Sequence, residues 1–316
     1  MMRVTAGFAC CTLVCWGFAV PPIVEQPSDT RDGLTAIAGI RVGHYTLDSR
    51  PAGCAVVLTE AGAVATVDVR GTAPGTRETA LLDPVDTVQR VHAIVLSGGS
   101  AFGLSAADGV MRYLEERHMG YATRAANVPI VPDAILYDLG VGDDPTIHPT
   151  AECGYLAARA ATDGPITEGS VGAGTRATVG KLGGPGRAMK GGIGTAMLEL
   201  GNGVRVAALM AVNARSGENT TIGVVATNAR LDKAELPIVA RMAHDGLARA
   251  VRPAHIPSDG DTIFAIATGK ITDNVSLLRI GAIAADATGD AIVRGVRAAT
   301  SLPGYPSAGD LQGGVR

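Results

Sequence analysis

The sequence predicts an α/β protein with four layers, in which two stacked β-sheets are covered on the outside by helices. Short apolar runs rich in β-branched residues recur along the chain, and helical patterns stand between them. Aromatic residues make up only 3% of the chain, against 42 glycines. Ala, Val, Ile and Leu must therefore build the interior, and small side chains in a core require close contact between helices and sheets.

The strands are predicted from alternating or continuous apolar runs, which cover 37–45, 55–58, 63–69, 93–97, 134–138, 204–212, 221–227 and 262–268. Helical spacing predicts helices over 101–117, 151–162, 233–251 and 277–299. Asp232 and Glu235 have the spacing of a capping box at the start of the third helix. In the last helix an apolar stripe of Ile, Ala and Gly should pack on a sheet, opposite a charged face made of Arg279, Asp286, Asp290, Arg294 and Arg297.

Composition narrows the classes of function. The chain has 316 residues, 47% hydrophobic and 18% charged, without a low-complexity tract or repeat, which favours one large globular domain. Its net charge is -3 and it has no cluster of Lys and Arg, so neither nucleic acid nor an anionic membrane surface is an expected partner. Small molecules or peptides are the expected partners.

The N-terminal segment leaves two interpretations open. Residues 1–23 contain an apolar stretch after Arg3 that has the regions of a signal peptide, or they follow a mis-annotated start. The protein would be exported in the first case and cytoplasmic otherwise. Residues 24–33 are predicted to be a linker, and 34–316 a single catalytic domain. Outside the N-terminal segment only Cys54 and Cys153 remain, which could pair in an exported protein but form no zinc site.

Two glycine-rich motifs invite comparison with known sites. The tract 169–194 resembles a phosphate loop, but its spacing is too long and Leu182 replaces the required Ser or Thr, which leaves a flexible loop as the interpretation for most of it. Gly98-Gly99-Ser100 joins a strand to a helix, yet Phe102 stands where a nucleophile elbow needs glycine. We therefore interpret Ser100 as a helix N-cap, at a helix start whose N–H groups could bind a substrate carbonyl or carboxylate; simple strand-to-helix packing is the alternative.

Thr220 carries the main chemical prediction. It opens an apolar strand directly after Asn219, so cleavage of the Asn219–Thr220 bond would free a threonine amine. A hydroxyl needs a base beside it to act as a nucleophile, and an α-amine with a pKa of about 7.7 to 8.0 is such a base. An ordinary strand residue, or a glycosylation sequon at 219–221, is the alternative for this motif alone.

Asp259-Gly260-Asp261 precedes the next strand and taken alone would be a turn. Brought near the amine of Thr220, its two carboxylates could orient the amine and shuttle its proton. A metal site of His255, Asp259 and Asp261 has no other ligand at a recognised spacing, so no metal and no cofactor are expected.

Together these segments resemble the self-processing aminopeptidase family of the DmpA type, over about residues 34–300. They look closest to its 6-aminohexanoate-oligomer hydrolase branch. The resemblance rests on the ordered motifs at 39–45, 96–104, 134–138, 172–181, 219–222 and 259–264. It implies the four-layer αββα fold shared with ornithine acetyltransferase, similar to hydrolases with an N-terminal nucleophile.

The resemblance also implies roles for individual residues. The precursor would be cleaved into an α chain ending at Asn219 and a β chain of residues 220–316, with Thr220 as nucleophile. Asp259 and Asp261 would contact its α-amine, where many relatives have a Ser/Glu pair and a serine nucleophile. By position, Asn213 corresponds to the oxyanion-hole amide, Tyr137 to a tyrosine of the substrate pocket and Lys181 to a lysine near the nucleophile.

The expected activity is hydrolysis of short peptide or ω-amide bonds through an acyl-enzyme on Thr220. The resemblance further implies a homotetramer built from both chains of the precursor. Two alternatives stay open: an acyltransferase like ornithine acetyltransferase, supported by the run 189–194, and an unprocessed binding protein that keeps the sheet core.

Overall fold

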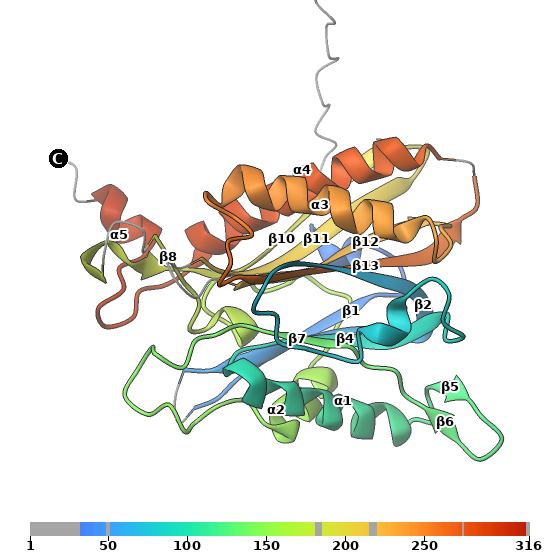
Figure 1. Ribbon diagram of the computed structural model, residues 1–316, viewed down its shortest axis with the longest axis horizontal. Coiled ribbons are helices and arrows are strands. Elements are labelled where there is room, and N and C mark those ends of the chain that lie inside the picture. Colours follow the sequence, from blue (N-terminus) through green and yellow to red (C-terminus); the bar gives the residue numbers. More distant parts are fainter. Residues whose placement is uncertain (1–31, 49–50, 181–184, 215–219, 274, 314–316) are drawn as a thin grey trace, which may run out of the picture.

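The computed structural model describes residues 32–48, 51–180, 185–214, 220–273 and 275–313. Its layers follow one another as helices, sheet, sheet and helices (Figure 1). One outer layer holds α3 (Leu236–Ala250) and α4 (Leu277–Ala298), and the other holds α1 (Ala106–Glu115) and α2 (Ala151–Arg159). The predicted four-layer αββα architecture is confirmed.

The two sheet layers are halves of one hydrogen-bonded sheet. The half under α3 and α4 has the order β10 (Gly192–Gly201), β11 (Val204–Asn213), β12 (Thr220–Ala229) and β13 (Gly260–Ile271). The other half contains β2 (Gly53–Gly71), β4 (Arg90–Ser97), β7 (Asp133–Ile135) and β3 (Thr76–Arg77), with β1 (Arg41–Thr46) paired to β2.

Strand β2 connects the two halves, because its 19 residues are long enough to pair in both. Residues 53–58 pair with β1 and β4, and residues 64–71 pair with β13. The register against β4 shifts between Leu58 and Ala63, where Gly62 has a φ of +77°. Such an irregularity bends a strand and increases its twist, which lets one sheet fold into two layers.

Three apolar clusters fill the spaces between the layers. One lies between the sheet halves and includes Ile222, Val224 and Phe264 together with Val57 and Leu96. A second joins the β10–β13 half to α3 and α4, and a third joins β2 and β4 to α1 and α2. All ten residues of β12 are buried, because this strand is covered on both faces.

The shorter elements mostly connect these layers. They are β5 (Tyr121–Ala122) with β6 (Asn127–Val128), β8 (Thr178–Val179) with β9 (Met189–Lys190), α5 (Ala308–Gly313), and the 3-10 helices η1 (Leu34–Ala36), η2 (Ala80–Leu82), η3 (Ser100–Ser105), η4 (Gly172–Gly174) and η6 (Pro185–Arg187). The capping box ahead of α3 is confirmed: Asp232 N donates to Glu235 Oε2 at 3.0 Å, and Glu235 N to Asp232 Oδ1 at 2.8 Å.

The interpretation of 169–194 as mostly a flexible loop is wrong for the described part of that tract. It contains η4, β8 and β9, and β10 begins at Gly192. Glycine is needed at Gly194 because a Cβ there would lie 2.2 Å from the backbone nitrogen of Gly295 in α4. The glycines let a helix lie directly on the sheet, rather than loosening the chain.

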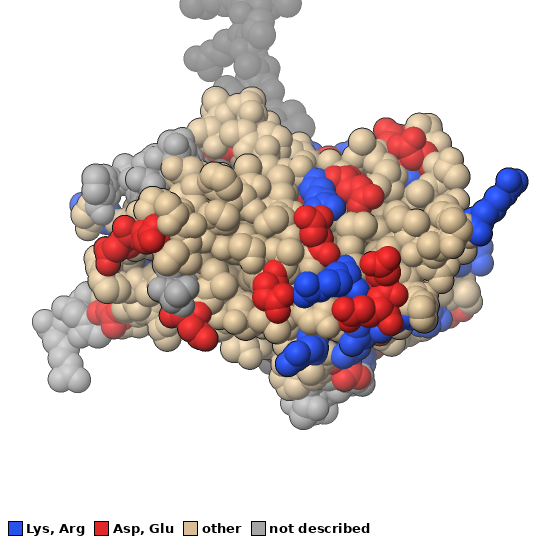
Figure 2. Space-filling model, turned by 90° about the horizontal axis from the view of Figure 1, so that it is seen from below, with Lys and Arg blue, Asp and Glu red and all other residues tan. Residues whose placement is uncertain are grey.

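The outer surface of α1 and α2 carries charges of both signs. Figure 2 shows this side of the molecule, with basic and acidic side chains interleaved. Arg112 Nη2 lies 2.8 Å from Glu152 Oε2, and the guanidinium of Arg117 lies over the ring of Tyr113, 3.6 Å from its centroid. Within the described ranges, no helix has both the length and the apolarity needed to cross a membrane.

Candidate functional site

Thr220 is the first residue of β12 and is only 5% exposed. It pairs with Asn213, the last residue of β11, in the antiparallel ladder between the two strands. The preceding residues 215–219, which include the predicted cleavage residue Asn219, lie outside the described residues. The predicted nucleophile therefore stands at the end of a buried strand, opposite the predicted oxyanion-hole residue.

Asn213 is held by hydrogen bonds on both sides of its amide. Its Oδ1 accepts from Thr178 N at 3.0 Å and from Thr178 Oγ1 at 3.3 Å, while its Nδ2 donates to the carbonyl oxygen of Tyr137 at 2.8 Å. An amide nitrogen carries two hydrogens, so the bond to Tyr137 uses only one of them. These contacts fix which end of the amide is nitrogen and leave Nδ2 with a second hydrogen to donate.

Asp259 and Asp261 lie at the start of β13, which runs parallel to β12 with Ile222 opposite Thr262. Because parallel neighbours begin at the same end of a sheet, the two aspartates come close to the start of β12. Asp261 Oδ1 accepts a hydrogen bond from the backbone nitrogen of Thr221 at 2.8 Å. The side chains of Asp259 and Asp261 are both buried.

Two glycines make this approach of the chain feasible. A Cβ on Gly71, at the end of β2, would lie 2.2 Å from the carbonyl oxygen of Asp259. A Cβ on Gly260 would lie 2.5 Å from the carbonyl oxygen of Ala73. Larger residues at either position would push the aspartate pair away from the end of β2.

The segment 98–100 lies next to residues 136–138, of which Tyr137 accepts from Asn213 Nδ2. Gly99 N donates to Asp138 Oδ1 at 2.7 Å, and Ser100 N donates to the carbonyl oxygen of Leu136 at 2.9 Å. Both N–H groups are thus already bonded within the protein, Gly99 N to a carboxylate and Ser100 N to a backbone carbonyl.

The prediction that Ser100 is a helix N-cap is wrong. Gly99 caps η3 with a φ of +84°, and Ser100 lies inside the 3-10 helix with a φ of +55°. The chain turns sharply as it leaves β4, and this turn moves the cap position one residue towards the N-terminus.

Tyr137 contacts the site through its backbone. Its carbonyl oxygen is the acceptor for Asn213 Nδ2, and its side chain is partly buried. Lys181, the predicted lysine near the nucleophile, lies outside the described residues.

A different lysine is linked to Asn213 through Thr178. Lys190 pairs with Thr178 across the β8–β9 ladder, and Thr178 is the residue that contacts Asn213 Oδ1. Lys190 has no exposed surface, and its Nζ donates to the carbonyl oxygens of Gly174, Ala177 and Gly191 at 2.8 to 3.0 Å. Burial lowers the pKa of Lys190 to about 7, although the negative charge of Asp138 acts in the opposite direction.

Sequence patterns alone gave Lys190 no role of its own, beyond its place in the run 189–194. The available signal was the lysine directly followed by Gly191 and Gly192 at the start of a strand. A Cβ on Gly191 would lie 3.1 Å from the carbonyl carbon of Ala177, whose oxygen accepts from Lys190 Nζ, so glycine at this position allows the close approach of that backbone segment.

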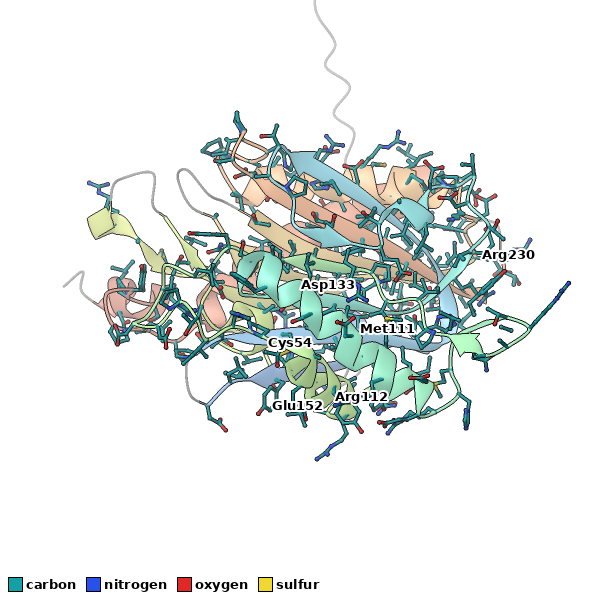
Figure 3. The ribbon with its side chains drawn as sticks, turned by 60° about the horizontal axis from the view of Figure 1, so that its bottom comes forward. Cys54, Met111, Arg112, Asp133, Glu152 and Arg230 are labelled. Atoms are coloured by element: carbon teal, nitrogen blue, oxygen red, sulfur yellow. A yellow bond between two sulfur atoms is a disulfide. The ribbon has the colours of Figure 1, made fainter. Side chains whose placement is uncertain are left out.

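Asp133 is another buried ionisable residue, on the α1 side of the sheet (Figure 3). Burial raises the pKa of its carboxyl well above the usual value, and the nearby charge of Arg77 lowers it again in part. Arg77 itself is bonded to Asp108 of α1 at 2.6 Å. Asp133 therefore belongs to the packing of α1 on the sheet and not to the Thr220 site.

A cavity of about 340 Å³ lies between β1 and the segment that follows α2. It is lined by His44, Thr46, Thr162 and Ile166 among others. Burial lowers the pKa of His44 to about 4, so this imidazole is neutral near pH 7.

The aspartate pair does not form part of a metal centre with the side chains that the structure describes. Among those residues, no group of three or more His, Cys, Asp or Glu side chains could hold a metal ion. His255 instead makes a hydrogen bond of 2.8 Å from Nδ1 to Asp261 Oδ2.

The sequence profile of peptidase family S58 matches residues 32–308, which contain every described residue of this site. The chain belongs to peptidase family S58. The resemblance to self-processing aminopeptidases of the DmpA type is thereby confirmed, and this S58 chain is a hydrolase of amide bonds.

Relatives agree with this assignment. The S58 chain is 40% identical to an uncharacterized aminopeptidase of Mycobacterium leprae, over 87% of this chain and 93% of the relative. It is 29% identical to a 6-aminohexanoate-oligomer endohydrolase of a Kocuria species, over 88% of this chain and 93% of that protein.

A solved structure shows the same fold at lower identity. It is the L-aminopeptidase D-Ala-esterase/amidase of Ochrobactrum anthropi, described as a variant of the Ntn hydrolase fold. The TM-score is 0.72 at 20% identity, over 90% of this chain and 92% of that one.

Proposed function

We propose that this S58 chain is an amidohydrolase activated by its own cleavage before Thr220, with the freed threonine as nucleophile. One observation carries the proposal: Thr220 begins a buried strand with Asn213 opposite it and the carboxylate of Asp261 on the N–H of Thr221. Residues that carry a hydroxyl, an amide donor and a carboxylate thus lie at neighbouring ends of β11, β12 and β13, which supports the proposal. These are the groups that acyl transfer through an N-terminal nucleophile requires.

In the proposed reaction, the α-amine of Thr220 takes the proton of Oγ1 while this oxygen attacks the substrate carbonyl. The second hydrogen of Asn213 Nδ2 is available to the oxyanion that forms, and loss of one such donor costs about 2.7 to 4 kcal/mol in a comparable hydrolase. The departing amine takes up the proton, which leaves an acyl ester on Thr220. Water then cleaves this ester and restores the free hydroxyl.

Self-cleavage would use the same hydroxyl on the carbonyl carbon of Asn219. Oγ1 forms an ester with the carbonyl of Asn219 as the Asn219–Thr220 amide bond breaks, which frees the α-amine of Thr220. Water then hydrolyses the ester to the carboxylate of Asn219 and the free hydroxyl of Thr220. Lys190 also supports the proposal, because a side chain with a pKa of about 7 can exchange a proton near neutral pH. It pairs with Thr178, which in turn bonds the amide of Asn213.

The proposed substrates are short peptides or linear ω-amides, and the proposed assembly is a homotetramer of processed chains. The names of the relatives support this substrate class, since one is an aminopeptidase and another acts on 6-aminohexanoate oligomers. No cofactor takes part in the proposed steps, since the nucleophile, base and oxyanion donor are all protein groups.

The first test is the mass of the purified protein. We expect two fragments on a denaturing gel, with intact masses that place the cut before Thr220, instead of one species of 32.0 kDa. Thr220→Ala should remove both cleavage and hydrolysis of an aminoacyl 4-nitroanilide, because it removes the attacking oxygen.

Thr220→Ser is the matched control, because it keeps the hydroxyl and removes only the methyl group. It should still cleave and still turn over substrate. Cleavage that persists in Thr220→Ala, or a fully active protein that remains one chain, would show that the nucleophile is assigned wrongly.

A further inference from the structure

The segment 255–256 holds both aspartates of the site. The backbone nitrogen of His255 and its Nδ1 both lie within hydrogen-bond distance of Asp261 Oδ2, at 3.2 and 2.8 Å. The backbone nitrogen of Ile256 donates to Asp259 Oδ2 at 2.8 Å. A carboxylate only accepts hydrogen bonds, so His255 Nδ1–H is the donor to Asp261.

The two oxygens of Asp261 are thereby divided between two tasks. Oδ2 is bound by His255, and Oδ1 accepts from the N–H of Thr221, the residue after the proposed nucleophile. The Asp261 side chain is 3% exposed, whereas that of His255 is 22% exposed. His255 therefore joins a buried carboxylate at the start of β12 to the protein surface.

We infer that His255 is a positioning residue for the reaction, because its imidazole holds Asp261 in the orientation that keeps Oδ1 at the start of β12. The inference rests on the function proposed above. His255 acts through Asp261, whose Oδ2 it binds while Oδ1 accepts from the backbone nitrogen of Thr221.

The surroundings of His255 fix its ring. The ring of His244, from α3, lies edge-on to it with centroids 4.9 Å apart. His244 Nε2 is bonded to the carbonyl oxygen of Asp68 at 3.1 Å, and burial lowers the pKa of His244 to about 4, so a neutral ring packs against His255. A neutral neighbour supports the ring of His255 without competing for the carboxylate of Asp261.

The backbone of His255 limits which substitutions are informative. Its φ is +58°, in the left-handed region where Gly, Asn and Asp are tolerated better than other residues. His255→Asn keeps a side-chain N–H donor for Asp261, whereas His255→Asp has the same size as the Asn variant but places a second carboxylate there. His255→Gly removes the side chain without straining the backbone.

The experiment measures self-cleavage by intact mass, and kcat and KM with alanine 4-nitroanilide, for the wild type and these three variants. We expect His255→Asp and His255→Gly to lower kcat about 100-fold, the scale of loss when a reacting group is misplaced by about 1 Å. KM should change little, because the substrate site is intact. His255→Asn should retain most of kcat, because its amide can donate to Oδ2.

His118→Gly is the matched control, since His118 is exposed, has a φ of +56° and lies outside the site. It should leave kcat unchanged. Equal loss in the Asn and Asp variants, or full activity in both Asp and Gly variants, would overturn the role of His255. If the Gly variant fails to fold, the Asn and Asp pair alone decides between these outcomes.

The same experiment separates this inference from the proposed function. A wild-type protein that stays uncleaved yet hydrolyses the anilide would refute the Thr220 mechanism, whatever the His255 variants do. A cleaved and active wild type together with indifferent His255 variants would refute only the role of His255.

Discussion

Lys190 is buried completely, and three backbone carbonyl oxygens accept from its Nζ. An ammonium group has three hydrogens to donate and satisfies all three oxygens, whereas a neutral amine has only two. Burial disfavours the charged ammonium and lowers the pKa of Lys190 to about 7, against an ordinary value of 10.5. Lys190 therefore changes charge near neutral pH, and it pairs with Thr178, the residue that bonds the amide proposed for the oxyanion hole.

This pKa predicts how stability depends on pH. Between pH 7 and 10.5 the unfolded chain binds a proton at Lys190 that the folded chain does not, so unfolding takes up a proton and stability rises with pH. Below pH 7 both states are protonated and the folded state carries the full cost of the buried charge. We expect the difference in unfolding free energy between wild type and Lys190→Met to shift in favour of the wild type by up to about 1.4 kcal/mol per pH unit in this range.

Denaturant unfolding at pH 7.5 and pH 9 measures this shift. The unfilled carbonyl oxygens in Lys190→Met add a cost that is the same at both pH values, so it cancels in the comparison. The Lys270→Met variant, which replaces an exposed lysine, serves as control and should show no such dependence. A difference that stays constant with pH would contradict a lowered pKa for Lys190.

At the scale of elements, glycines set how closely α4 lies on β10. A Cβ on Gly295 would come within 2.7 Å of Gly194 N and 2.8 Å of the carbonyl carbon of Ile193. Gly289 of the same helix has its nearest such neighbour at 3.6 Å, an ordinary contact. The two positions differ in packing but share the helical backbone.

Gly295 and Gly289 therefore allow two substitutions to be compared within one helix. Gly295→Ala should lower the free energy of unfolding by about 1 to 3 kcal/mol, because the methyl group forces α4 away from the sheet. Gly289→Ala should raise it by about 0.4 to 1 kcal/mol, because alanine favours the helix. Thermal or denaturant unfolding of both variants measures the sign, and a stabilised Gly295→Ala would show that the helix is not in this close contact.

Many of the helices and strands could be predicted from the sequence. The helices 277–299 and 233–251 and the strand 204–212 agree with α4, α3 and β11 to within three residues, because their patterns are long and regular. The strand β10 was missed, because Gly192 and Gly194 weaken a strand pattern, and the reason for these glycines is the close packing of α4 on the strand. Predicted strands 55–58 and 63–69 proved to be one strand, whose pairing with β4 shifts register between Leu58 and Ala63, where the apolar pattern is interrupted.

The site could be predicted in part for the same reason. Thr220, Asp259 and Asp261 follow from local motifs at strand ends, and their approach follows from the parallel pairing of β12 and β13. Lys190 and His255 could not be assigned, because their contacts depend on segments that fold back from elsewhere in the chain. Lys181 remains a prediction.

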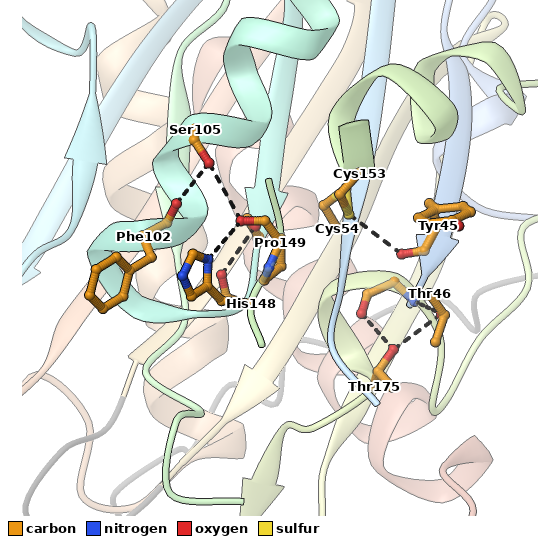
Figure 4. The surroundings of a disulfide bond; sticks show 12 residues. Tyr45, Thr46, Cys54, Phe102, Ser105, His148, Pro149, Cys153 and Thr175 are labelled. Carbon is orange, nitrogen blue, oxygen red and sulfur yellow. Dashed lines mark hydrogen bonds between the residues drawn. A yellow bond between two sulfur atoms is a disulfide. The ribbon is translucent and has the colours of Figure 1, made fainter. Parts of the chain in front are cut away.

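At the scale of the whole molecule, a disulfide joins Cys54 of β2 to Cys153 of α2 (Figure 4). The two residues are 99 apart in sequence and both are buried. The bond ties the α1 and α2 layer to the strand that runs through both sheet halves. Both cysteines precede Thr220, so the proposed cleavage would leave the disulfide within one fragment.

Removal of this bond should destabilise the protein. We expect the double variant with Cys54→Ala and Cys153→Ala to lose about 2 to 4 kcal/mol of unfolding free energy, because a long closed loop restricts the unfolded chain. Unfolding with and without dithiothreitol measures the effect. The reductant should lower the melting temperature of the wild type and leave that of the double variant unchanged; a wild type indifferent to reductant would contradict a contribution of this bond.

The ladder between β11 and β12 has a consequence for how the mature protein forms. Eight residue pairs hold these strands together, from Asn213 with Thr220 to Val206 with Thr227, and the proposed cut falls between the two strands. The precursor would reach this arrangement as a single molecule, at a rate independent of its concentration. Once cut and fully denatured, the two pieces would have to find each other in solution, so recovery of the native state would become a second-order process.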